Sequence, residues 1–498
     1  MIGILDTFLP IICFVLFSIL TVPIGKAIRR GENRKTAFTL GWFLSVFVAA
    51  GISVASLAIK YYEYPSPRPF LSITLASESF AIFSTTFLID AISIYLAVIF
   101  TVIGAVAFLY SIFYIDPSDR LSERYYSVML LIIGCIIGAA FSGDLLTLFI
   151  FWEASAAGSS FLMLYPRTSK SVHATLKYLV MIIIASAFIV YGLSIVYSIT
   201  GTLNFWAVKQ ALIALDDKHL LVVAFIFIAA GYAIEAAVVP FHMWLPDAYT
   251  AAPASSSAFL SALIDQGSYY VLLRVLIYIL TPPTVLNWTV MLAIFSALTM
   301  IVGNLLALTQ NNVKRLIANV CIADVGYNLA AITSVTPLGI MGNLYFFLIG
   351  GITTALSFMA VGIFNRVKLN TLDDFTGIGR KMPFTSLALL LGAFSFAGIP
   401  PLAGFIAKYL VFTAAIEANL SWLAVVGVLT SVIQTAYLLR LITCMYGKTP
   451  MGGTRIEEPK RLLVPIFILV TAIIVLGIYP TIVLDLIEPV IQQLPLTP

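Results

Sequence analysis

The stretch Gly231–Tyr249, GYAIEAAVVPFHMWLPDAY, decides the fold. It begins as an apolar helix that carries a lone carboxylate, Glu235, and it then meets Pro240 and Pro246. Proline lacks a backbone N–H and clashes with the preceding turn, so the helix must kink or open there. In lipid, the freed backbone groups need partners from protein or water. A buried acid beside such a break is typical of an ion site in a transporter, and the alternative is a kinked helix with a tolerated acid.

A second interruption lies near the other end of the chain, in Ala397–Phe405, AGIPPLAGF. Lys408 follows it inside another apolar stretch. The sequence therefore predicts two broken helices, one with an acid and one with a base. Gly/Pro-interrupted segments at corresponding places in two halves are the best sequence indication of a transporter site.

The composition indicates a polytopic helical membrane protein. Of 498 residues, 61% are hydrophobic and 10% are charged, and the mean hydropathy is +1.05. Soluble domains carry about 25% charged residues, so this class is excluded. The net charge of +4 does not indicate a nucleic-acid partner, because the basic residues flank apolar runs. The N-terminus lacks the features of a cleaved signal peptide, and the first apolar run is expected to be retained.

Fourteen stretches approach the length of about 20 apolar residues that a membrane helix needs. We therefore predict an all-α fold with about fourteen transmembrane helices. They are expected at 6–25, 37–59, 84–113, 125–141, 144–165, 174–199, 220–239, 254–280, 287–308, 313–334, 339–364, 384–416 (broken), 420–445 and 462–484.

Basic residues predict the orientation. Twenty Lys and Arg fall in loops on one side of the predicted membrane and four on the other. Such residues concentrate on the cytoplasmic side. We expect a multi-pass protein of a prokaryotic cell membrane with both termini on the outer side.

The two halves of the chain match in spacing. Glu153 and Glu235 lie 82 residues apart in the fifth and seventh spans, and Asp324 and Lys408 lie 84 apart in the tenth and twelfth. Opposite orientations of these units predict two inverted five-helix repeats, each with a broken helix. The expected organisation is 1–120 (helices 1–3), 121–285 (repeat one, helices 4–8), 286–446 (repeat two, helices 9–13) and 447–498 (helix 14).

No cofactor site is expected in this chain. The four cysteines are far apart, the three histidines are scattered, and neither a CxxC motif nor a Gly-rich phosphate loop occurs. These patterns do not fit an iron–sulfur cluster, a zinc site or another metal centre. Any redox chemistry is therefore expected to belong to partners.

Several motifs together resemble one family, the antiporter-like membrane subunits. They are FWE at 151–153, PFHMWLPD at 240–247, APA at 252–254, VGY at 325–327 and GIPPLAGF at 398–405 followed by Lys408. The family includes the proton-pumping membrane subunits of respiratory complex I, the large subunits of Mrp-type sodium/proton antiporters, and membrane subunits of energy-converting hydrogenases. The resemblance implies fourteen spans, the inverted repeat and a chain of ionisable groups that relays protons in the membrane plane.

The resemblance also implies functional residues. Glu153 matches the family's glutamate in the fifth span, and Lys408 matches its lysine in the second broken helix. With Glu235, they form the predicted proton relay. Further relay or portal residues are expected at His242, Asp247, Asp265 and Asp324.

Four positions differ from the family pattern. Glu235 stands where a lysine is usual, and Gln266, with Asp265 beside it, aligns with a usual lysine or histidine. Thr354 replaces a frequent lysine, and Asp324 replaces Gln or Ser. In the family a glutamate–lysine pair is thought to couple the two half-channels, but here two acids would face each other.

This acid pair has a physical consequence. Two nearby carboxylates in a medium of low dielectric constant cannot both ionise easily, so we expect Glu153 and Glu235 to share a proton. A bound cation would relieve the same repulsion. Arg274 and Arg440 are expected to snorkel to the membrane surface or to pair with Asp265 and Gln434.

Three functions remain open at this point. The leading one is an ion-translocating subunit of a redox-driven complex of the hydrogenase or complex I type, with other membrane subunits, a peripheral redox arm and the lipid bilayer as partners. The second is an Mrp-type antiporter subunit. The third is a bridge between subunits that kept the fold and lost transport. The ion would be H+, with Na+ as the alternative.

Overall fold

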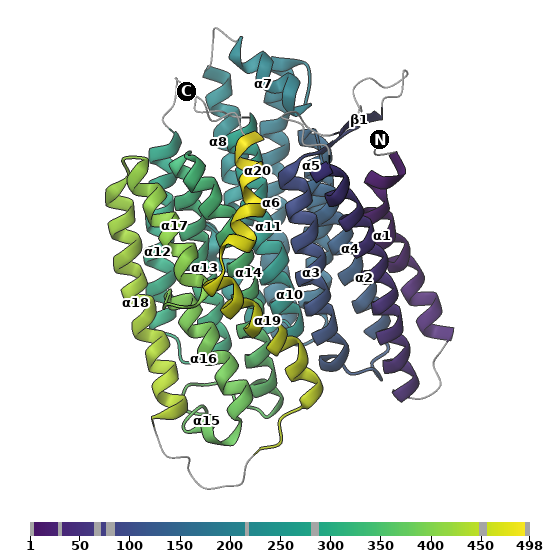
Figure 1. Ribbon diagram of the computed structural model, residues 1–498, viewed down its shortest axis with the longest axis vertical. Coiled ribbons are helices and arrows are strands. Elements are labelled where there is room, and N and C mark those ends of the chain that lie inside the picture. The colour runs from purple at the N-terminus through teal and green to yellow at the C-terminus, as the bar shows by residue number, and fades with distance from the viewer. Residues whose placement is uncertain are drawn as a thin grey trace.

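The computed structural model describes residues 4–27, 32–63, 71–75, 85–214, 219–279, 288–447 and 456–493. Most of these residues form a bundle of long helices (Figure 1). Within the described part, eleven helices are long and apolar enough to cross a membrane. This confirms a polytopic helical membrane protein. The eleven are α1 (Ile4–Ala27), α2 (Glu32–Glu63), α3 (Ala91–Tyr114), α4 (Ser122–Ala140), α5 (Leu145–Leu164), α6 (Ser169–Thr200), α12 (Trp288–Leu308), α13 (Val313–Ser334), α14 (Pro337–Arg366), α18 (Ser421–Tyr446) and α19 (Lys460–Ile478).

The first broken helix is present. It comprises α8 (His219–Glu235), the 3-10 turn η2 (Phe241–Trp244) and α9 (Leu245–Ala251). The ring of Pro240 would clash with the carbonyl of the residue four positions earlier, so the helix cannot continue through it. Ala237 takes a left-handed conformation (φ 54°) that begins the break. The helix therefore ends at Glu235 itself, which places this carboxylate directly at the break.

The second broken helix is also present, as α16 (Pro383–Ala397) and α17 (Ala403–Glu417). Gly398 caps the end of α16 with φ 73°, a conformation that glycine adopts without steric cost. The prolines that follow prevent continuation of the helix. Both predicted breaks are thus confirmed.

One predicted span is less regular than expected. The region 254–280 consists of α10 (Ala254–Leu260), the π-helical turn η3 (Ser261–Asp265), α11 (Gln266–Leu273) and a second π-helical turn, η4 (Arg274–Ile279). Such turns are rare and occur frequently at functional sites. Here they place Asp265 and Arg274 at the junctions between segments of different helical pitch.

A two-stranded hairpin departs from the all-helical prediction. Strand β1 (Leu71–Leu75) pairs antiparallel with β2 (Thr85–Ile89), and Leu71 lies opposite Ile89. The predicted span 84–113 was therefore wrong at its start, because TTFLI is rich in β-branched and aromatic residues and forms a strand. The hairpin is held by Asp144, whose carboxylate accepts from the Thr86 backbone N–H at 2.8 Å.

Close helix crossings occur in both halves at glycines. A Cβ on Gly231 of α8 would lie 2.9 Å from the Ala185 carbonyl oxygen of α6. A Cβ on Gly303 of α12 would lie 2.6 Å from the Ala323 nitrogen of α13. Small residues let membrane helices approach closely and gain van der Waals contact, which replaces the hydrophobic driving force of water. These crossings hold α8 and α13, the helices that carry Glu235 and Asp324.

Three short helices complete the described elements: α7 (Phe205–Ile213), α15 (Ile378–Lys381) and α20 (Thr481–Gln493). Helix α7 lies over one end of the bundle, near the start of α8 (Figure 1). Helix α1 begins and α20 ends toward this same end of the molecule (Figure 1).

A buried ion pair joins α3 to η4. Arg274 Nη1 lies 2.5 Å from Asp90 Oδ2, and the two side chains are 0% and 6% exposed. The guanidinium also lies 5.7 Å from the ring centres of Phe205 and Tyr270. The expectation that Arg274 snorkels or pairs with Asp265 was wrong, because Arg274 is fully buried and pairs with Asp90, the N-cap residue of α3. Arg440 instead donates to the Leu308 carbonyl and the Asn311 side chain, not to Gln434.

This pair predicts a stability effect. Removing one member of a buried ion pair leaves the other charge uncompensated and typically costs about 3–5 kcal/mol. We expect Arg274→Met to lower the thermal unfolding midpoint of the detergent-solubilised protein strongly. The double variant Asp90→Asn, Arg274→Met should regain part of the loss, because no lone charge remains. Equal midpoints for wild type and Arg274→Met would contradict this account.

Candidate functional site

The structure brings the two glutamates of the first half together. The carboxyl groups of Glu153, on α5, and Glu235, at the end of α8, lie close enough to interact electrostatically. Ser186 Oγ donates to Glu153 Oε1 at 2.7 Å, and the Trp152 indole N–H donates to Glu235 Oε2. Glu235 is 6% exposed. Glu153 is half-buried, and each acid accepts a hydrogen bond from a neighbouring side chain, so the first break ends beside a pair of acids of which Glu235 is the buried member.

Lys408 forms the corresponding centre in the second half, one turn beyond the second break. Its Nζ donates to Gln434 Oε1 at 2.5 Å and to Ser431 Oγ at 3.1 Å. The same Nζ lies 4.5 Å from the ring centre of Tyr327. Asp324 faces Gln434 and the charge of Lys408. The buried cation is thus stabilised by two neutral oxygens, an aromatic face and a nearby carboxylate.

Glycines of the second break make room for this lysine. A Cβ on Gly398 would lie 3.1 Å from Lys408 Cδ, so the lysine stem packs against the bare backbone. A Cβ on Gly404 would lie 1.9 Å from the Ser395 carbonyl oxygen. No larger residue fits there without moving the backbone. The GIPPLAGF motif therefore positions Lys408 by close backbone approach.

A small cavity lies beside the same centre. Its volume is about 10 Å³, and its lining includes Asp324, Ser395 and Lys408. A cavity of roughly 10–15 Å³ is at the lower limit for a single water molecule. The space between the acid and the base is therefore of the size of one water, which is a chemically suitable proton carrier.

Asp265 lies between the two centres. Tyr249 of α9 donates its hydroxyl to Asp265 Oδ1, while Oδ2 has no hydrogen-bond partner in the described part of the chain. Asp265 is 5% exposed and close enough to Asp324 for the two carboxyl groups to interact electrostatically. Tyr178, on α6, is likewise near both Glu235 and Asp265. These side chains form a buried polar line from one half to the other.

His242 and Asp247 lie apart from this line. His242 is buried in η2, and its Nδ1 has no hydrogen-bond partner among the described residues. Asp247 is 30% exposed and forms ion pairs with Lys177 at 2.7 Å and Arg315 at 2.8 Å. The structure therefore brings five of the seven candidate residues together and leaves these two at the far side of the first break.

Several contributing residues were missed by the sequence analysis. Lys314 is one of the twenty basic residues that predicted the orientation, yet it is only 6% exposed. The hydrogen-bond partners of the acids and of the base were not predicted either. These partners are Trp152 for Glu235, Tyr249 for Asp265 and Gln434 for Lys408. Trp152 and Tyr249 belong to the quoted motifs or adjoin them, and this was the available signal. In the described ranges, no group of three or more His, Cys, Asp or Glu is placed to hold a metal ion.

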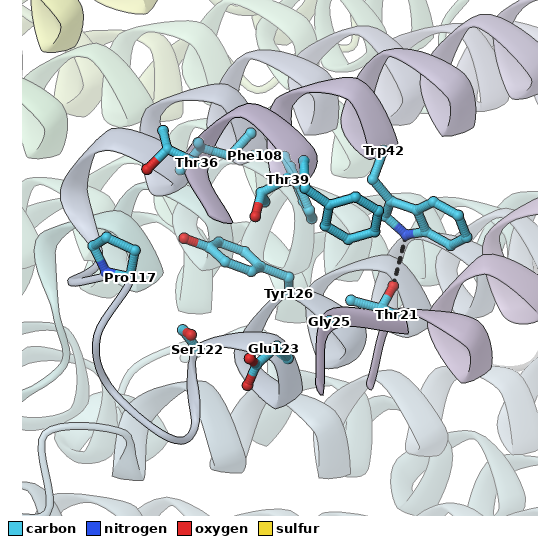
Figure 2. A pocket seen from close by; sticks show the side chains of 12 residues that line it. Thr21, Gly25, Thr36, Thr39, Trp42, Phe108, Pro117, Ser122, Glu123 and Tyr126 are labelled. Carbon is cyan, nitrogen blue, oxygen red and sulfur yellow. Dashed lines mark hydrogen bonds between the residues drawn. The ribbon is translucent and has the colours of Figure 1, made fainter. Parts of the chain in front are cut away.

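A further small pocket lies outside this line, among α1–α4. Figure 2 shows Glu123 and Tyr126 at its wall, with the Trp42 indole N–H donating to Thr21 Oγ1 at 2.9 Å. Its volume is about 30 Å³, enough for roughly two waters. A Cβ on Gly25 would lie 2.5 Å from Glu123 Cγ, so this glycine makes room for the acid. We assign the pocket no part in the relay.

Comparisons with known proteins fit this site. The family model described as NADH:quinone oxidoreductase/Mrp antiporter, TM matches residues 142–434, which contain every residue of the buried line. The chain is 32% identical over 416 residues to the F(420)H(2) dehydrogenase subunit N of Methanosarcina mazei, covering 81% of this chain and 84% of that protein. It is also 32% identical over 398 residues to the NADH-quinone oxidoreductase subunit N of Moorella thermoacetica, covering 79% and 83%.

A solved structure has the same fold. A chain in the membrane-bound sulfane sulfur reductase, an archaeal respiratory membrane complex, matches with a TM-score of 0.88 at 25% identity, covering 98% of this chain and 97% of that one. The protein therefore belongs to the NADH:quinone oxidoreductase/Mrp antiporter family of membrane subunits. The resemblance inferred from its motifs is confirmed.

Proposed function

We propose that this chain translocates protons, with Na+ as the alternative ion, as a membrane subunit of a redox-driven complex of the complex I or hydrogenase type. The observation that carries the proposal is the buried line of ionisable side chains between two broken helices. Charged groups are expensive inside a membrane, and they mark ion pathways when they occur there. Glu153, Glu235 and Lys408 are its proposed relay residues, and Asp265 and Asp324 connect them.

The proposed topology has fourteen crossings. The eleven long helices account for most of them, and three interrupted paths complete the number: α8 with α9, α10 through η4, and α16 with α17. In this arrangement residues 121–285 and 286–446 form the two inverted repeats, flanked by 1–120 and 447–498. Both termini lie on the outer side of a prokaryotic cell membrane, because most basic loops then face the cytoplasm.

The acid pair supplies the chemical step in the first half. A proton shared by Glu153 and Glu235 removes the repulsion between two carboxylates in a medium of low dielectric constant. Departure of this proton leaves two like charges together, and the pair then attracts a new proton or another cation. The hydroxyls of Tyr178 and Tyr249 lie along the way to Asp265.

The second half works with opposite charges. Lys408 carries the positive charge, and Asp324 is its nearby counter-charge. Protonation of Asp324 would remove that attraction and weaken the hold on the lysine charge. Each half thus has a centre whose energy changes when one proton arrives. Asp265 interacts with Asp324 of the second centre and would be the connection to the first.

The proposed partners follow from the names of the relatives. Those proteins are subunits of an F(420)H(2) dehydrogenase and of an NADH-quinone oxidoreductase. We place this chain beside other membrane subunits, in contact with lipid and with a peripheral redox arm that holds the electron carriers. No cofactor is assigned to the chain itself.

Two alternatives remain as outcomes of the test. The matching family model also covers Mrp antiporters, whose complexes would need no redox arm. The second alternative is a bridge subunit without transport. It is favoured by the proximity of two acids where the family has an acid–base pair.

Purification of the native complex through a tag on this chain tests the proposal. We expect other membrane subunits and an oxidoreductase arm with iron–sulfur clusters, and proton uptake by proteoliposomes when the electron donor is supplied. Copurification of small membrane subunits alone would favour the Mrp alternative. An intact redox complex that moves no ion would favour the bridge. Proton exchange by the purified single chain would contradict the need for partners.

A further inference from the structure

We propose that Lys314 and Arg315 form a latch that couples the two halves of the ion pathway. The latch clamps α9, the second part of the first broken helix, to the start of α13, the helix that carries Asp324. Lys314 is then a positioning residue, because it touches neither the acid pair nor Lys408. The inference rests on the proposed function and deepens it.

The first observation is where the buried lysine charge is held. Lys314 Nζ donates to the carbonyl oxygens of Thr250, at 3.3 Å, and of Ala252. Both carbonyls lie at the C-terminal end of α9. The last carbonyls of a helix lack intrahelical partners and carry partial negative charge, so a cation there is favourable. Lys314 thus caps α9 from another helix.

The second observation is that both cations lie at the N-terminal end of their own helix, where positive charge is unfavourable. Lys314 and Arg315 lie in the first turn of α13, where the helix dipole disfavours positive charge. Asn312 caps that turn by accepting from the Arg315 backbone N–H at 2.9 Å. The compensating negative groups come from α9, namely its terminal carbonyls and Asp247, which pairs with Arg315 at 2.8 Å. The charges are therefore explained by the contact between the two helices.

The third observation is that α9 touches the buried line as well. Tyr249, two residues from Asp247, donates to Asp265. Lys177 of α6 completes the charged groups around Asp247. Because α9 has only seven residues and lies between two interruptions, it can move as one short rigid segment. A change in the charge of Asp265 would act on Tyr249 and so on the whole of α9.

The latch passes this movement to the second half. Asp324 lies ten residues after Lys314 on the same continuous helix, which is about 15 Å along its axis. A helix transmits a displacement of its first turn along its length more readily than a loop does. Coupling needs such a contiguous element with two arrangements, and α9, the latch and α13 provide the connection. The Lys314 ammonium group recognises α9 by binding the two carbonyl oxygens at its C-terminal end.

The test compares Lys314→Met with Lys314→Arg in the whole complex. Methionine keeps the length of the side chain and removes its charge, while arginine retains the charge. We expect Lys314→Met to assemble, to lower donor-driven proton uptake about tenfold and to shift its pH profile, within the range typical of coupling between sites. Lys314→Arg should restore most of the rate. Lys170→Met, an exposed lysine in the first turn of α6, is the matched control and should behave as wild type.

A double-variant cycle separates coupling from simple anchoring. Combining Lys314→Met with Asp324→Asn should cost much less than the product of the single effects, because the latch acts through Asp324. Multiplying effects would overturn the inference, as would a wild-type rate and pH profile for Lys314→Met in an assembled complex. If Lys314→Met does not assemble, Arg315→Gln, which alters a partly exposed pair, takes its place with the same expectations. A wild-type complex that transports no ion would instead overturn the proposed function.

Discussion

Lys408→Ala is expected to abolish proton movement through the second half of the chain while the complex still assembles. The variant removes the cation that Gln434, Ser431 and Tyr327 surround, and Asp324 loses its counter-charge. Loss of a proton-transferring group typically lowers a rate by about 100-fold to 10,000-fold. Assembly should persist, because loss of a charge from mid-membrane lowers the cost of inserting α17.

Donor-driven proton uptake by proteoliposomes measures this effect, with redox turnover as the measure of assembly. Lys170→Ala changes an exposed lysine and serves as the control. Normal uptake with Lys408→Ala would show that the relay runs elsewhere, and equal loss of redox turnover and uptake would indicate a failure of the complex instead.

The second large effect is expected at the acid pair. Glu235→Gln should be tolerated, because the amide oxygen can still accept from the Trp152 indole. It should nevertheless depress transport by about 100-fold, since an amide cannot exchange the shared proton. Glu235→Lys should also leave the chain folded, because Glu153 becomes its counter-charge. This variant restores the acid–base pair of the family and should move the pH dependence of transport.

Ion-linked activity of the whole complex across pH distinguishes the three forms. Glu417→Gln, at the exposed end of α17, is the matched control for removing an acid. Identical profiles for wild type, Glu235→Gln and Glu235→Lys would remove Glu235 from the pathway. The bridge reading would then be preferred.

The two helix breaks could be predicted from sequence because their causes are local. Pro240 removes a donor and clashes within its own helix, and Gly398, followed by two prolines, can take the left-handed conformation that ends a helix. The hairpin was missed because apolar composition does not separate a short strand from the start of a membrane helix. The π-helical turns have no comparable signal in the sequence.

The candidate site could be predicted in part for the same reason. The acids and the base are visible in an apolar sequence, since each stands out as an unusual residue. Their partners are not, because Arg274 and Asp90 lie 184 residues apart and only the packed helices bring them together. Lys314 looked like a loop residue, since a basic pair at the start of a span normally marks the cytoplasmic boundary. The structure shows instead that Lys314 is buried against the C-terminal end of α9.

The hydrogen bond from Trp152 to Glu235 gives the molecule an optical reporter of its own. An indole N–H that donates to a carboxylate senses whether that oxygen is charged, and indole emission responds to such a change in the local field. The chain has six tryptophans, so replacing the other five by phenylalanine would leave Trp152 as the sole indole of the chain, which can be excited apart from its tyrosines. The protonation state of the acid pair could then be followed by fluorescence during turnover, without any added dye.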